Sequence, residues 1–307
     1  MFKFKRKIWD LTITRNQSVF HTCLAASGAV LYSKLFFVPA KEEVNIVSEL
    51  EHTNVYTNKQ NLDLYTQALE KICLNPKLLK KVTLIYDQLI KNLEVASKNL
   101  LKECSEDNFQ KYLDCYTKLT AGLFLTAIFG RRISVLLKDK LSNLYPNFNS
   151  EQIDIKVAEL SYPEVNTPLT LSQVGLLKLV VKIKKQNILL NELTTSKLSK
   201  EFNDLQEKFR AIPVNYSGDP WIEVDFLNQL KNILNDNPEK TLKDFEENHK
   251  TRIKTMRRQI ALLPTEYLKK LCYGLQVCTT YNEKRKFAIC NAALAYRPLF
   301  ILVAKKK

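Results

Sequence analysis

Apolar residues recur every three or four positions along most of this chain, which is the spacing of one face of an α-helix. The pattern is clearest at positions 78, 79, 82, 85, 89, 93, 96 and 100. Asn75 followed by Pro76, directly before this run, fits an N-cap and a first helical residue. The pattern therefore predicts a long amphipathic helix that begins at Pro76.

The same periodicity predicts further helices, separated by short breaks that contain proline, asparagine or serine. We predict helical segments from Ser18 to Pro39 and at 62–74, 105–129, 130–144, 150–160, 170–185, 221–235, 238–263 and from 265 onward. Residues 187–210 predict either one helix or a pair of helices. Thr170 with Gln173 has a capping-box pattern, and Asp219-Pro220 again fits a cap and a first helical residue. Segment 41–60 is polar and predicts a short helix and a loop.

The predicted fold class is all-α, a bundle-like array of many helices with short connections. No run of alternating β-branched residues predicts a strand, and only six glycines are present, fewer than sheets with many turns need. We expect one helical domain over 1–307, with two lobes hinged at 211–220, because this stretch is the longest one rich in helix breakers.

The net charge of +15, from 47 basic and 32 acidic residues, favours an anionic partner. Nucleic acid, a phosphorylated ligand, an acidic protein and a membrane surface all meet that description. Most of the basic residues are lysines, which also suits a solvated surface that keeps the protein soluble. The charge alone therefore leaves the partner open.

The motifs of common enzymes and metal sites are missing from the sequence. It holds neither GxxxxGK[ST] nor GxGxxG, and neither GxSxG nor HExxH. Its seven cysteines have no CxxC spacing, and its three histidines are far apart, which indicates reduced, buried thiols rather than a zinc site. We expect no metal, no cofactor and no catalysis by this chain alone.

The N-terminal segment invites a targeting interpretation that its details do not support. Residues 1–10 are basic and 19–32 are moderately apolar, but Asp10 and Arg15 separate the two, and the apolar stretch is too short to span a bilayer. We therefore expect a cytoplasmic protein without a membrane partner.

The strongest candidate for a site lies near the C-terminus, where two polar residues interrupt an apolar helical face. Steps of three and four residues join the members of this face, which are Leu271, Leu275, Cys278, Asn282, Arg285, Ile289 and Ala292. A guanidinium in such a face is costly unless something pairs with it. Two interpretations stay open: a ligand site, or a buried ion pair with Glu283 or another acidic neighbour.

Other basic residues are weaker candidates. Arg131 and Arg132 follow an apolar helix, where they form either an anion site inside the bundle or a pair favoured by the dipole of a helix C-terminus. A basic face at Arg252, Lys254, Arg257 and Arg258 either binds phosphates or is solvated and paired with Glu246 and Glu247.

Five stretches, in order, carry a resemblance to a known family: WDLTITRNQSVFH, TAGLFLTAIFGR, AELSYPEVNTPL, IPVNYSGDPW and YNEKRKFAICNAALAYRPLF. Together they resemble the helical middle region of phosphoenolpyruvate-utilising phosphotransferases of the phosphoenolpyruvate synthase and rifampin phosphotransferase type. In that family an ATP-grasp domain loads a phosphoryl group onto a histidine of a swivelling domain. Neither domain is recognisable in this chain, and His21, His52 and His249 lack the surroundings of the family's phosphohistidine.

The resemblance implies a non-catalytic helical acceptor-binding or scaffold subunit that works with separate ATP-grasp and histidine-domain partners. The candidate anion-binding residues are Arg15, Arg131, Arg132, Asn282, Arg285 and Arg297. The alternative is a basic helical module that binds nucleic acid.

Overall fold

The computed structural model describes residues 8–13, 28, 31–37, 45–49, 52–123, 129–214 and 219–305. α-Helices make up most of this part of the chain, so the predicted all-α array is confirmed. The helices are α2 (Lys59–Leu74), α3 (Pro76–Lys102), α4 (Glu106–Leu123), α5 (Phe129–Leu144), α6 (Ser150–Leu160), α7 (Pro168–Lys185), α8 (Ser199–Phe209), α9 (Glu223–Leu234), α10 (Pro238–Ala261) and α11 (Glu266–Lys305). Short 3-10 helices are η1 (Ser33–Phe36), η3 (Leu190–Glu192) and η4 (Ile212–Val214).

A small antiparallel sheet precedes the helices. Its strands are β1 (Ile8–Ile13), β2 (Asn45–Glu49) and β3 (His52–Asn58), in the order β1-β3-β2. The expectation of a short helix and a loop over 41–60, and of no strand, was therefore wrong. β3 pairs with β1 across more than thirty intervening residues, from Ile8 opposite Asn58 to Ile13 opposite Thr53. Such long-range pairing leaves a weak local signal in the sequence.

Two predicted helix starts are confirmed by their caps. The Asn75 side chain accepts hydrogen bonds from the backbone N–H groups of Lys77 and Leu78, both at 3.1 Å. Asn237, ahead of Pro238, likewise accepts from a backbone N–H group in the first turn of α10. At these two positions a side-chain oxygen caps the helix and the proline that follows is its first residue.

Two other predicted starts were wrong. α7 is capped by Thr167 and begins at Pro168, one turn before the predicted capping box at Thr170. α9 begins at Glu223 and not after Asp219; its first turn is closed by the Asp225 carboxylate, which accepts from the N–H of Ile222 at 2.9 Å. The predicted start at Ser18 lies outside the described residues.

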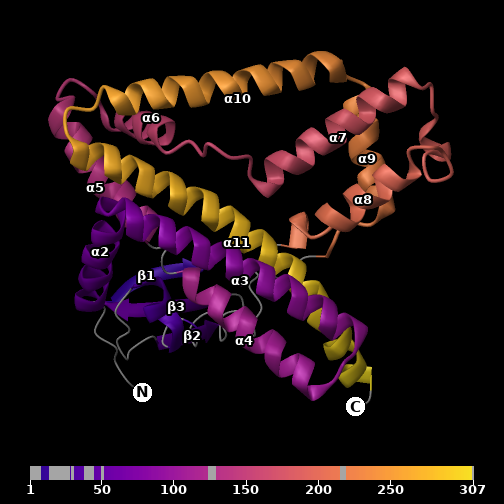
Figure 1. Ribbon diagram of the computed structural model, residues 1–307, viewed down its shortest axis with the longest axis horizontal. Coiled ribbons are helices and arrows are strands. Elements are labelled where there is room, and N and C mark those ends of the chain that lie inside the picture. The colour runs from indigo at the N-terminus through magenta and orange to yellow at the C-terminus, as the bar shows by residue number, and fades with distance from the viewer. Residues whose placement is uncertain are drawn as a thin grey trace.

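α11 crosses the molecule and packs against helices from every part of the chain, with α3 its most extensive neighbour (Figure 1). The apolar face predicted from the sequence is confirmed: Leu271, Leu275, Cys278, Arg285, Ile289 and Ala292 are all buried, and Asn282 is half-buried. The long helix thus joins α2, α3, α4 and α5 into one core.

The described residues form two separate hydrophobic cores. The larger core takes side chains from α2 to α6, from α10 and from α11, and the smaller one from α7, α8 and α9. Phe287 of α11 packs against the smaller core, where its ring centroid lies 6.2 Å from that of Phe209. Both flanks of 211–220 reach the smaller core, and the hinge placed there stays a prediction.

Gly122 marks a close approach inside the larger core. The ring of Tyr86 lies between Phe36 and Tyr281, with centroid distances of 4.7 and 5.0 Å, and its hydroxyl donates to the carbonyl of Gly122. A Cβ atom at position 122 would overlap the Tyr86 ring. Because Phe36 and Tyr281 both contact the Tyr86 ring, the ring cannot easily move away from an added Cβ atom.

We therefore expect Gly122→Ala to lower the free energy of unfolding by about 1–3 kcal/mol, although alanine is the better helix former. Urea unfolding followed by circular dichroism measures the change. Gly130→Ala is the matched control, because its Cβ would lie 3.3 Å from the Cβ of Cys278 and needs only a small shift. Equal losses in the two variants would contradict this account of Gly122.

Candidate functional site

Arg285 is a charged side chain in the interior of the larger core. It is 1% exposed and is the largest of the fully buried side chains. Its Nη2 donates to Oδ1 of Asn282, one turn earlier, at 3.2 Å. Its Nε and Nη1 have no hydrogen-bond partner among the described residues. A buried guanidinium with one neutral acceptor is incompletely paired, which is costly in a medium of low dielectric constant.

The neighbours of Arg285 along α11 fix its position between α3 and α4. Tyr281, one turn before it, stacks on Tyr86 of α3. Ala292, two turns after it, accepts a hydrogen bond at its carbonyl from Tyr112 of α4 at 2.9 Å. Arg285 therefore lies midway along the part of α11 that these two helices cover.

The carboxylate that α3 presents to α11 is already engaged. Oδ2 of Asp87 accepts from the Tyr281 hydroxyl at 2.8 Å, and its Oδ1 lies 3.6 Å from Nζ of Lys284. Burial and then the hydrogen bond to Asp87 raise the pKa of Tyr281, so the phenol stays protonated at neutral pH. These two α11 residues, and not Arg285, share the charge of Asp87.

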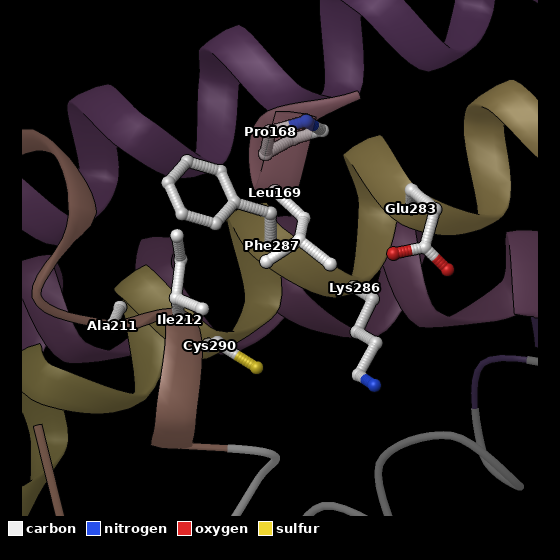
Figure 2. Close-up of a pocket in the computed structure, with 8 residues that line it drawn as sticks. All are labelled: Pro168, Leu169, Ala211, Ile212, Glu283, Lys286, Phe287 and Cys290. Atoms are coloured by element: carbon white, nitrogen blue, oxygen red, sulfur yellow. The ribbon is translucent and has the colours of Figure 1, made fainter. Parts of the chain in front are cut away.

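Glu283 does not pair with Arg285 either. Glu283 lies on the opposite side of α11, where it lines a pocket of about 100 Å³ together with Lys286, Phe287 and Cys290 (Figure 2). The rest of the lining comes from Pro168 and Leu169 at the start of α7 and from Ala211 and Ile212. No ion pair within the described residues includes Arg285, so the expected pairing with an acidic neighbour is not found there.

This pocket is smaller than the usual site for a small molecule. Sites for small molecules usually measure about 300–1,000 Å³. Figure 2 shows Lys286 and Glu283 projecting from α11 while the Phe287 ring turns toward Ile212. Arg285 does not line the pocket.

The other predicted anion contacts lie elsewhere in the sequence, and the structure describes only two of their side chains. Arg131 is exposed and Arg132 half-buried, both in the first turn of α5. The expectation that a helix C-terminus favours this pair was wrong, because the positive end of the α5 dipole lies there. Arg15 lies outside the described residues, and Arg297 lies in α11 without a described side chain.

The basic face of α10 is paired differently from the expectation. Arg257 forms a two-pronged ion pair with Glu164, with N–O distances of 2.8 and 2.9 Å. Glu246 and Glu247 bind Lys178 and Lys243 instead of the basic face. The predicted pairing with these two glutamates was therefore wrong.

Burial makes several thiols unreactive. It raises the pKa of Cys272 and of Cys278 to about 12, and it raises the pKa of Cys73 well above its usual range. All six described cysteines are free. Among the described residues, no group of three or more histidine, cysteine or carboxylate side chains is placed to hold a metal ion.

No protein-family model, curated protein or solved structure matches this chain. None of the helices in the described ranges is long and apolar enough to cross a membrane. The functional assignment therefore rests on the chemistry of the buried guanidinium and its surroundings.

Exchanging Asn282 tests whether the Arg285 guanidinium lacks a counter-charge. Asn282→Ala removes its one hydrogen-bond acceptor, and we expect a loss of about 1–3 kcal/mol in the free energy of unfolding. Asn282→Asp keeps the shape but supplies a carboxylate beside the guanidinium, so this variant should be at least as stable as the wild type at pH 7. Urea unfolding compares the three proteins. An aspartate variant as unstable as the alanine variant would contradict an unmet charge at Arg285.

Proposed function

We propose that this chain is a non-catalytic helical subunit that binds an anionic group at Arg285 and Asn282, carried by a small acceptor or by a partner protein. The observation that carries the proposal is the buried guanidinium, whose Nε and Nη1 donate to no described residue. A buried ion loses several kcal/mol of hydration. Proteins keep such local conflicts mainly where function requires them.

The resemblance to phosphoenolpyruvate-utilising phosphotransferases supports the same assignment. Arg285 lies in YNEKRKFAICNAALAYRPLF, one of the five stretches that carry the resemblance. An all-α array is what the helical middle region of that family leads us to expect. We propose that the phosphoryl group comes from a separate protein with an ATP-grasp or phosphohistidine domain, and that the two meet in the cytoplasm.

The chemistry next to Arg285 favours binding over bond-making. The Tyr281 phenol and the Cys278 thiol, on the same part of α11, both have raised pKa values because they are buried. At neutral pH each keeps its proton and is a poor nucleophile or base. A guanidinium, always protonated, is suited to holding phosphate or carboxylate through paired N–H donors.

Arg285→Leu separates the function from the fold. Without a buried charge, the ligand-free variant should be more stable than the wild type, by about 1–4 kcal/mol. Phosphoenolpyruvate or inorganic phosphate should raise the thermal unfolding temperature of the wild type and leave that of the variant unchanged.

Lys286→Leu is the matched control, because it removes one positive charge from the same helix at the next residue, which lines the small pocket and not the Arg285 site. This control should keep the response to the anion. The assignment of Arg285 is wrong if Arg285→Leu keeps the full response as well. Three negative results together would overturn the proposed function as a whole. The wild type would respond to neither probe, a pull-down would recover no ATP-grasp or histidine-domain protein, and no phosphoryl group would be transferred when candidate subunits are mixed.

A second candidate function, nucleic-acid binding, is favoured by the exposed side of α10. Lys254 and Arg258 lie one turn apart there, both are exposed, and neither forms an ion pair within the described part of the chain. Cations at helical spacing can contact successive phosphates of a nucleic acid.

If this second function holds, affinity for generic RNA or DNA should fall steeply as salt rises from about 50 to 200 mM, because bound phosphates release counterions. Fluorescence anisotropy with a labelled oligonucleotide measures the effect, and a double change of Lys254→Gln and Arg258→Gln should reduce the salt dependence. An affinity that does not depend on salt rules this function out.

A further inference from the structure

A second hollow lies between α3 and α4, away from the Arg285 site. It measures about 280 Å³, close to the smallest sites that hold small molecules. α3 contributes Lys91, Asn92, Val95, Ala96 and Asn99, and α4 contributes Asn108, Lys111 and Cys115. We refer to these eight residues as the α3–α4 groove. The two helices lie side by side in Figure 1 and pack closely along their length.

The groove is positively charged. Lys91 comes from one helix and Lys111 from the other, and no carboxylate side chain is among the lining residues. Both lysines are exposed, and neither forms an ion pair within the described ranges. Two ammonium groups on separate helices, neither of them in an ion pair among the described residues, attract a ligand with negative charge at more than one point.

Asn92 and Asn108 in the groove each use one atom of the side-chain amide in a hydrogen bond within the protein, and the other atom can bind a ligand. Oδ1 of Asn92 accepts from Nε2 of Gln88 at 2.7 Å, which leaves the Nδ2 donor of Asn92 for a ligand. Nδ2 of Asn108 donates to the carbonyl of Glu103 at 3.0 Å, which leaves its Oδ1 as an acceptor. These bonds also fix the orientation of both amides. The groove therefore presents oriented polar groups beside its two cations.

Apolar atoms complete the lining. Val95 is 52% exposed although it sits between the two helices, Ala96 is buried, and the half-buried Cys115 lies across from them on α4. A short carbon chain of a ligand would bury this apolar surface, and its removal from water is favourable. The groove thus indicates the class of ligand that fits it, because it is small and combines two cations, oriented amides and an apolar patch.

We propose that the α3–α4 groove binds a short organic dianion, a dicarboxylate or a small organic phosphate, held between Lys91 and Lys111. The ligand's carbon chain lies on Val95 and Ala96, and a charged oxygen accepts from Asn92. The site is independent of the function proposed for Arg285, because the two share no residue.

Cys115 reports directly on occupancy of the groove. A bound ligand should shield its thiol from iodoacetamide, while Cys104, exposed in the connection between the same two helices, stays open as an internal control. Burial raises the pKa of Cys115, so the reaction is followed at about pH 9 to supply thiolate. Mass spectrometry of peptides resolves the two sites in the full-length protein.

The probes are succinate and glycerol 3-phosphate, each compared with potassium chloride at equal ionic strength. We expect at least one of them to slow alkylation of Cys115 about fivefold or more near saturation, without slowing Cys104. Which probe acts decides between a carboxylate and a phosphate ligand. No slowing beyond that of potassium chloride, or equal slowing at both cysteines, overturns the proposal.

Charge variants test the two lysines. Lys91→Gln and Lys111→Gln should each raise the probe concentration needed for half-maximal protection about tenfold, the scale of a lost charge-assisted hydrogen bond. Lys77→Gln, on the same α3 but outside the groove, should leave it unchanged. Circular dichroism confirms folding, which these exposed positions do not affect. Protection that survives both groove substitutions, or is lost equally in Lys77→Gln, rules the site out.

Discussion

The burial of α11 is the constraint on which the larger core depends. This helix covers α2, α3, α4 and α5 and sends Phe287 to the smaller core, so a change in its packing reaches most of the described chain. Arg285 sits in the middle of that burial, where a leucine would pack at lower cost. The surrounding contacts, Tyr281 with Tyr86 and Tyr112 with the carbonyl of Ala292, hold the helix in place and keep the guanidinium buried.

The distribution of carboxylates explains why this charge stands out. Asp87 is bound by Tyr281 and Lys284, and Glu164 by Arg257, so acidic groups that face neighbouring helices have basic or phenolic partners. Arg285 has only the amide oxygen of Asn282. An anion supplied from outside the described residues would accept hydrogen bonds from Nε and Nη1 of Arg285. The lack of acceptors for these two nitrogens, and not a sequence motif, motivates the function proposed for the chain.

Contacts between separate elements also shape the surface. The α3–α4 groove forms because two helices pack with small residues and carboxamides at their seam, which leaves Lys91 and Lys111 on opposite rims. Likewise α10 is tied to the connection after α6 by Glu164 and by the Tyr162 hydroxyl, which lies 2.9 Å from Nδ1 of His249. Neither arrangement follows from the spacing of residues within a single helix.

Local chemistry was readable in the sequence wherever neighbours along the chain decide the outcome. The cap at Asn75, the start of α10 at Pro238 and the apolar face of α11, with Asn282 and Arg285 on it, follow from spacing of one to four residues. The sheet and the partners of Asp87 did not follow, because backbone pairing and packing between residues far apart decide them. The sequence thus determined that a guanidinium would lie in an apolar helical face. Only the tertiary structure decided that no described carboxylate would meet it, since that depends on which side chains the other helices bring to the same place.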